Sequence, residues 1–175
     1  MVPTWMLAST EQVQAKNPET TIDASIRDGV LALLARYGRC ADHDPAGSGW
    51  SDCFEDDALL SSYSPRPGRP PALLRGCAAI ERAFASAPKT AATTHVTSNV
   101  LIERAPGDPI VAIRSAFVRF DHLPGIGVVV GSFGRYSDRA RPCDDGLWRF
   151  CEREIHLISR RSPPAAGMAS QQPST

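Results

Sequence analysis

The chain has 175 residues, 42% hydrophobic and 22% charged, a composition typical of one globular domain with its own core. Nineteen basic residues balance nineteen acidic ones, which argues against a general nucleic-acid-binding protein, because such a protein needs a basic excess to offset phosphate. No apolar run reaches the roughly 18 to 20 residues of a membrane span.

Further patterns narrow the class of protein. The first residues lack the basic start and long apolar core of a signal peptide. The five cysteines form no C-x-x-C pair, the spacing found in zinc ribbons and redox motifs. We therefore expect a cytoplasmic protein with no metal site and no cofactor, which binds neither nucleic acid nor membrane.

The first half of the chain is predicted to be mainly helical. Residues 1–20 are mixed and polar and predict a loosely attached arm. From Ile26 to Cys40 apolar residues recur at three- and four-residue steps, which predicts an amphipathic helix ending near Asp42. A short helical turn, a charged turn, a strand, a Pro-rich loop and a second helix follow, at residues 50–54, 55–57, 58–63, 64–71 and 77–85.

The second half is predicted to be mainly strands. Long runs rich in β-branched residues are separated by turn signals, at residues 95–104, 110–121, 128–138 and 147–158. Residues 159–175 are rich in Pro, Ala, Ser and Gln and predict a disordered tail. Helices followed by strands indicate an α+β domain over residues 21–158, with the first helix packed into a curved sheet beside a cavity.

The strongest candidate for chemistry is His95, at the start of the first long strand. Thr97 and Asn99 follow at even spacing, so all three side chains should share one face of the strand. If that face lines a cavity, His95 is the best general base in the chain, because the reference pKa of histidine lies near neutral pH. The alternative is a histidine held in the core by a neighbouring group.

The landmarks along the chain resemble the SnoaL-like branch of the NTF2-like superfamily over residues 26–158. They occur in the expected order as LLARY at 33–37, WSDCFEDDA at 50–58, GCAAI at 76–80, HVTSN at 95–99, GRYSD at 134–138 and GLWRF at 146–150. The resemblance implies a cone in which a curved, largely antiparallel mixed sheet wraps around a long N-terminal helix, with two shorter helices. This fold serves enzymes and non-catalytic proteins alike, so it does not name a reaction.

Within that branch, the chain resembles scytalone dehydratase and hexachlorocyclohexane dehydrochlorinase at two positions. Both families carry an Asp at the end of the first helix and a His at the start of the strand after the second helix, which are Asp42 and His95 here. The dehydrochlorinase pattern adds an Asn at the position of Asn99. An aspartate that accepts the Nδ1–H of His95 would orient the imidazole and stabilise its protonated form. An Asp at a helix C-terminus opposes the macrodipole, so its presence calls for such a partner.

The chain departs from scytalone dehydratase at the residue before the Asp, which is Ala41 instead of Tyr, and it has no clear second His on the strand 110–121. Tyr37, Trp50 and Tyr136 are candidates for substrate contacts, and packing in the core is the alternative for each of them. Arg114 and Phe117 are further candidates, although alternation places them on opposite faces of their strand and does not say which face lines the cavity.

The last strand carries alternating charges, Arg149, Glu152, Arg153 and Glu154, which predict cross-strand ion pairs on its outer face. In function, the resemblance implies a cofactor-independent lyase or isomerase, such as a dehydratase or polyketide cyclase, acting on a mostly apolar small molecule. The alternative is a non-catalytic ligand carrier, or an assembly subunit like the β chain of ring-hydroxylating dioxygenases. A homo-oligomer, a dimer or trimer, is expected in either case.

Overall fold

A computed structural model describes residues 22–43, 49–87 and 92–160 of the chain. The predicted N-terminal arm, residues 1–20, and the predicted tail beyond residue 160 lie outside the described residues. The tail was predicted to begin at residue 159, but the last strand extends to Arg160. None of the helices in the described ranges is long and apolar enough to cross a membrane.

The long N-terminal helix α1 spans Ala24–His43 and confirms the helix predicted from the apolar spacing. The residues at three- and four-residue steps form its buried face: Ile26, Val30, Leu33, Leu34, Tyr37 and Cys40. The structure continues with the short helix η2 (Trp50–Asp52) and the second helix α2 (Cys77–Ser86), also close to their predicted positions.

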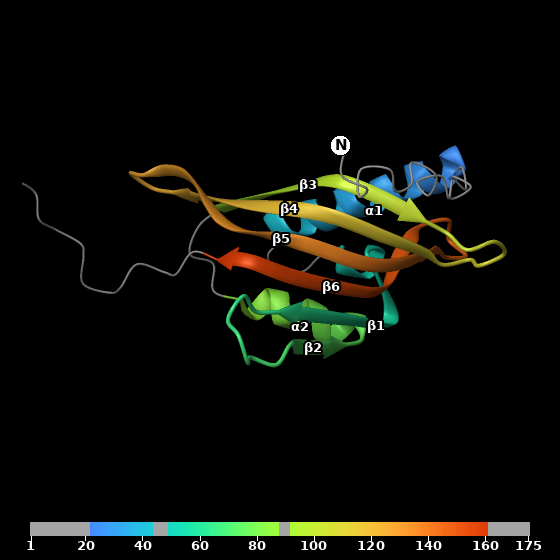
Figure 1. Ribbon diagram of the computed structural model, residues 1–175, viewed down its shortest axis with the longest axis horizontal. Coiled ribbons are helices and arrows are strands. Elements are labelled where there is room, and N and C mark those ends of the chain that lie inside the picture. The colour runs from blue at the N-terminus through green and yellow to red at the C-terminus, as the bar shows by residue number, and fades with distance from the viewer. Residues whose placement is uncertain (1–21, 44–48, 88–91, 161–175) are drawn as a thin grey trace, which may run out of the picture.

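Six strands form one sheet in the order β2-β1-β6-β5-β4-β3, in which only β1 and β6 pair in parallel (Figure 1). Their bounds are β1 Phe54–Tyr63, β2 Ala72–Arg75, β3 Ala92–Glu103, β4 Val111–Leu123, β5 Gly127–Pro142 and β6 Trp148–Arg160. Figure 1 shows α1 running behind the long strands while α2 lies beside β1 and β2. This arrangement is the predicted α+β architecture, with helices packed on one side of a mixed sheet.

One prediction about the first strands was wrong, and one strand was missed. Residues 55–57 were predicted as a charged turn but belong to β1, because Glu55 is buried and binds the Arg141 guanidinium through two hydrogen bonds of 2.6 and 2.8 Å. Strand β2 was not predicted. It pairs with β1 after the Pro-rich loop 64–71, so that loop belongs to a hairpin at the edge of the sheet opposite β3.

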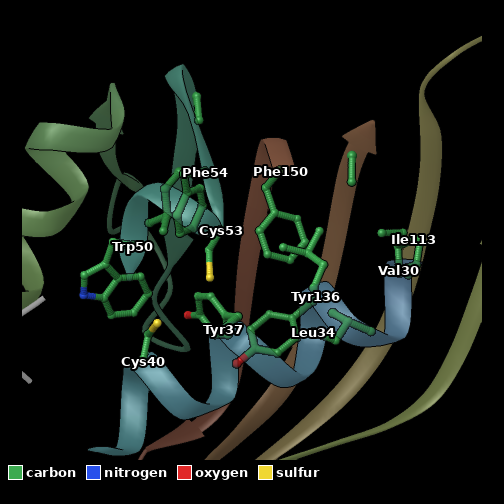
Figure 2. Close-up of a cluster of buried hydrophobic side chains, with 14 of the residues drawn as sticks. Val30, Leu34, Tyr37, Cys40, Trp50, Cys53, Phe54, Ile113, Tyr136 and Phe150 are labelled. Atoms are coloured by element: carbon green, nitrogen blue, oxygen red, sulfur yellow. The ribbon is translucent and has the colours of Figure 1, made fainter. Parts of the chain in front are cut away.

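The core fills the space between α1 and the concave face of the sheet. Tyr37 of α1 lies among aromatic rings from the rest of the fold, with ring centroids 5.6 to 6.2 Å apart (Figure 2). These rings belong to Trp50, Phe54, Tyr136 and Phe150. Their edge-to-face packing fills the middle of the cone.

Candidate functional site

A pocket of about 320 Å³ lies between α1 and β3, the edge strand of the sheet. This volume is at the lower end of the range for small-molecule sites. Its lining residues come from one stripe of α1 and from β3: Leu31, Leu34, Ala35, Gly38, Arg39, Asp42, His95, Thr97 and Val100. The walls are mainly apolar, and the polar groups gather at the C-terminal end of α1.

Asp42 and His95 meet in this pocket through a short hydrogen bond. His95 Nδ1 lies 2.6 Å from Asp42 Oδ1. The backbone N–H of His95 donates to Asp42 Oδ2 at 2.7 Å, and the Thr93 hydroxyl donates to Oδ1 at 3.0 Å. The last residues of α1 are thus tied to the start of β3, which explains why an aspartate is tolerated at this helix end.

The Asp42 contact sets the tautomer of His95. A carboxylate accepts hydrogen bonds, so in the neutral imidazole Nδ1 carries the proton and Nε2 keeps its lone pair. Within the parts of the chain that the structure describes, Nε2 has no hydrogen-bond partner. The side chains of His95 and Asp42 are 16% and 7% exposed, so the imidazole reaches the pocket while the Asp42 carboxylate is shielded from water. This arrangement can hold a proton acceptor in one orientation.

Asn99 was predicted to share a face with His95 and Thr97, and this prediction was wrong. Asn99 adopts a left-handed backbone conformation with φ 53°, at a bulge between Ser98 and Leu101. The extra residue shifts the alternation by one, so Asn99 is exposed and Val100 takes the inward position.

The facing of β4, which alternation left open, is decided by its neighbours. Ser115 and Phe117 are buried on the concave face, whereas Arg114 points outward and binds Glu103 with an N–O distance of 2.9 Å. Arg114 therefore does not reach the pocket. Arg119 shares the concave face and lies directly opposite His95 in the register, where it binds Asp121 at 2.9 Å.

Tyr37, Trp50, Phe117 and Tyr136 were candidates for substrate contacts, but the structure places them in the core. All four are almost fully buried, and none lines the pocket. Phe117 stacks on Tyr136 with ring centroids 4.3 Å apart, so its ring is part of the core packing. Burial raises the pKa of both Tyr37 and Tyr136, so their hydroxyls stay neutral.

Comparison with protein families gives a match to the SnoaL-like domain over residues 23–154. The chain belongs to the SnoaL-like domain family. The match covers the described fold from the start of α1 to β6, so it includes both Asp42 and His95. Comparison with curated proteins gives no match.

Three solved structures from Novosphingobium aromaticivorans show the fold of this SnoaL-like domain. An NTF2-like protein with a cystatin-like fold is 20% identical, with a TM-score of 0.62 over 75% of this chain and 81% of that one. The β subunit of a candidate aromatic-ring-hydroxylating dioxygenase is 19% identical, with a TM-score of 0.64 over 80% of this chain and 94% of that one. A candidate scytalone dehydratase is also 19% identical, with a TM-score of 0.61 over 83% of this chain and 95% of that one. At these identities the likeness establishes the NTF2-like fold only.

A carboxylate–cation pair lies in the core of the SnoaL-like domain. Arg153 was predicted on the outer face of β6, but a register irregularity opposite Arg139 and Ala140 turns it inward, where it is fully buried. Its guanidinium lies 3.8 Å from the ring centroids of Tyr37 and Tyr136. Asp138 Oδ2 lies 3.3 Å from Arg153 Nη1. Burial raises the pKa of Asp138 to about 7, although the positive charge of Arg153 acts to lower it.

Sequence reasoning missed most of the pocket wall. Leu31, Ala35, Gly38, Arg39 and Asp42 lie three, four or one residue apart, so they form one stripe of α1 beside its buried face. The helical period carried this signal, but Leu31 and Ala35 look like ordinary surface residues without the position of β3. No group of three His, Cys, Asp or Glu that could hold a metal occurs among the described residues.

Proposed function

We propose that this SnoaL-like protein is a cofactor-independent lyase or isomerase that removes a proton from carbon in a mostly apolar small molecule. One observation carries the proposal: His95 is held through Nδ1 by Asp42, and its Nε2, which has no hydrogen-bond partner among the described residues, lies in a pocket with apolar walls. A proton acceptor that is oriented and partly desolvated is the arrangement that general base catalysis requires.

The proposed reaction begins when Nε2 of His95 takes a proton from a carbon next to an activating group. The electron pair of the C–H bond then forms a double bond, and a leaving group on the neighbouring carbon departs with its own bonding pair. For a hydroxyl leaving group, the imidazolium returns the proton to the departing oxygen, which leaves as water. Asp42 stabilises the imidazolium during this interval. Isomerisation or cyclisation would use the same base with a different fate for the carbanion.

The tautomer of His95 tests this proposal before any substrate is known. ¹⁵N NMR of the imidazole should report Nδ1 as protonated and Nε2 as unprotonated, with a downfield proton signal for the short bond to Asp42. Asp42→Asn should abolish that signal and redistribute the tautomers. Thr93→Val removes only the hydroxyl contact and should preserve both.

His122, which bonds to Thr94 and not to Asp42, provides the internal reference. An unchanged His95 spectrum in Asp42→Asn, with His122 also unchanged, would contradict the proposed base.

The alternative function is an assembly subunit or ligand carrier, and self-association through the outer face of the sheet is compatible with it and with an enzyme alike. Val96, Val118 and Phe133 lie opposite one another on three neighbouring strands and face away from α1. Val96 is 47% and Phe133 39% exposed. A dioxygenase β subunit shares the fold, and exposed apolar rows of this kind are typical of interfaces. We propose that the chain forms homo-oligomers through this face.

Light scattering of the purified chain tests the interface. Wild type should be oligomeric, and Phe133→Glu should shift it towards monomer, whereas Arg114→Gln on the charged part of the same face should not. A wild-type chain that stays monomeric at high concentration would exclude this surface as a self-association site.

A further inference from the structure

The pocket contains one glycine that the packing of the protein does not explain. Gly38 lies inside α1, and a Cβ atom built on it would meet no atom within 4 Å. The other glycine of α1, Gly29, is explained, because a Cβ there would collide with the Trp148 ring. A glycine inside a helix destabilises it relative to alanine, so open space above Gly38 needs another reason.

The residue after Gly38 is a cation without a protein partner at the pocket. Arg39 lines the pocket and is exposed, and no ion pair or hydrogen bond joins it to another residue in the described ranges. Asp42 is the nearest carboxylate along the helix, one turn away, but its two oxygens accept the hydrogen bonds from Thr93 and His95. The charge of Arg39 is therefore available to a ligand.

We propose that Gly38 and Arg39 select the ligand of this pocket, which is a small molecule with an apolar body and one permanently anionic group, such as a carboxylate. The body packs on the bare backbone of α1 at Gly38, between Leu31 and Val100. The anionic group pairs with Arg39 at the rim, and the other end of the ligand contacts His95 of the Asp42–His95 pair. This inference rests on the proposed function in taking the same pocket as the site.

The position of Arg39 favours an anchoring role over stabilisation of charge in the reaction. Stabilising an oxyanion requires donors in a site from which water is excluded. Arg39 is at the exposed rim, where water and salt screen its charge. A permanent acidic group, held away from the reacting carbon, suits such a place. Its contribution is selectivity between charged and neutral ligands of the same shape.

A matched pair of probes tests the charge selectivity. Naphthalene-2-carboxylate and naphthalene-2-carboxamide share one apolar body, and only the first is anionic. In ¹H–¹⁵N NMR titrations of the wild-type chain, the carboxylate should bind about fivefold more tightly and shift the α1 and His95 signals. Arg39→Gln should reduce this ratio to about one, whereas the control Arg82→Gln on the exposed face of α2 should keep it.

A second pair of variants tests the packing surface. Gly38→Leu should weaken both probes while the melting temperature rises or is unchanged, because the new side chain fills open space. Ala32→Leu, on an exposed part of α1 outside the pocket, should leave both affinities as in wild type.

Three results would overturn the inference: an unchanged ratio in Arg39→Gln, wild-type affinities in Gly38→Leu, or no shift near Gly38 with either probe. None of them alters the His95 tautomer experiment, so a failure of ligand selection is distinguishable from a failure of the proposed base. Probe binding on the outer face of the sheet would shift β4 and β5 signals instead and would not respond to Arg39.

Discussion

The concave side of this protein holds two pairs in which an aspartate carboxylate meets a nitrogen-bearing side chain, and the two pairs differ in their surroundings. Asp42 and His95 lie at the rim, joined by a 2.6 Å hydrogen bond, and the carboxylate accepts two further hydrogen bonds from β3. Asp138 and Arg153 lie in the sealed core, 3.3 Å apart. Both side chains there have buried polar atoms without hydrogen-bond partners among the described residues.

The comparison shows that burial alone does not make a charged pair a functional site. The core pair has the more perturbed environment, because aromatic rings surround Arg153 and burial raises the pKa of Asp138 to about 7. The rings around Arg153 belong to Tyr37, Tyr136 and Phe150, none of which lines the pocket. The rim pair has an open nitrogen and space for a ligand. Accessibility of a reactive atom distinguishes the two.

The largest expected effect on stability comes from removing the cation beside the buried Asp138 carboxylate. Arg153→Met should lower the free energy of unfolding by about 3 to 5 kcal/mol, because it leaves Asp138 without a counter-charge. The double variant Arg153→Met/Asp138→Leu should recover most of that loss. Urea denaturation measures both values. If Arg153→Met is as stable as wild type, Asp138 carries no charge that needs Arg153 in the folded protein.

A smaller effect is expected from pH, and it has a definite sign. The pKa of Asp138 is raised from 3.8 to about 7 in the folded state, so between these values the folded protein binds more protons than the unfolded chain. Its contribution to stability is therefore present below about pH 4 and decreases as pH rises towards about 7. Melting temperatures of wild type should fall relative to Asp138→Asn across this range. Parallel profiles would contradict the raised pKa.

The rim pair should contribute less to stability than the core pair. Asp42→Ala removes the acceptor of three hydrogen bonds, but the freed groups lie near the pocket, where water can replace it. We expect a loss of about 2 kcal/mol in the free energy of unfolding, together with loss of the His95 tautomer preference. A loss of unfolding free energy as large as that of Arg153→Met would mean that the Asp42–His95 pair is primarily structural.

The smallest predicted effect contrasts the two glycines of α1. Gly38→Ala should raise the free energy of unfolding by about 1 kcal/mol, the difference in helix propensity, because its Cβ enters open space. Gly29→Ala should lower it, because its Cβ meets the Trp148 ring. Thermal denaturation of the two variants measures the difference. Destabilisation by Gly38→Ala would show that the space above Gly38 is occupied.

Helix α1 and the long strands were predictable because their signals are local. The burial of every third or fourth residue from Ile26 to Cys40 follows from the helical period, and the strands follow from β-branched runs between turns. The pairing of Asp42 with His95 was expected by resemblance to known enzymes. The short strand β2 was missed, because four residues after a Pro-rich loop carry too little periodicity to be detected.

The faces of the strands were not predictable wherever a bulge occurs. The extra residue near Asn99 turns that side chain outward, and the irregularity opposite Arg139 and Ala140 turns Arg153 inward. A bulge reverses the alternation for every later residue, and its position depends on the partner strand.

The helices, the long strands and the apolar face of α1 follow from the sequence alone, and the resemblance to known enzymes added the pairing of Asp42 with His95. The tertiary structure decided which side chains reach the pocket and which seal the core. It placed Tyr37, Trp50, Phe117 and Tyr136 in the core and brought Gly38 and Arg39 to the pocket wall. The physical reason is that local periodicity gives a residue its face, while only the packing of neighbouring elements determines whether that face is filled or left open.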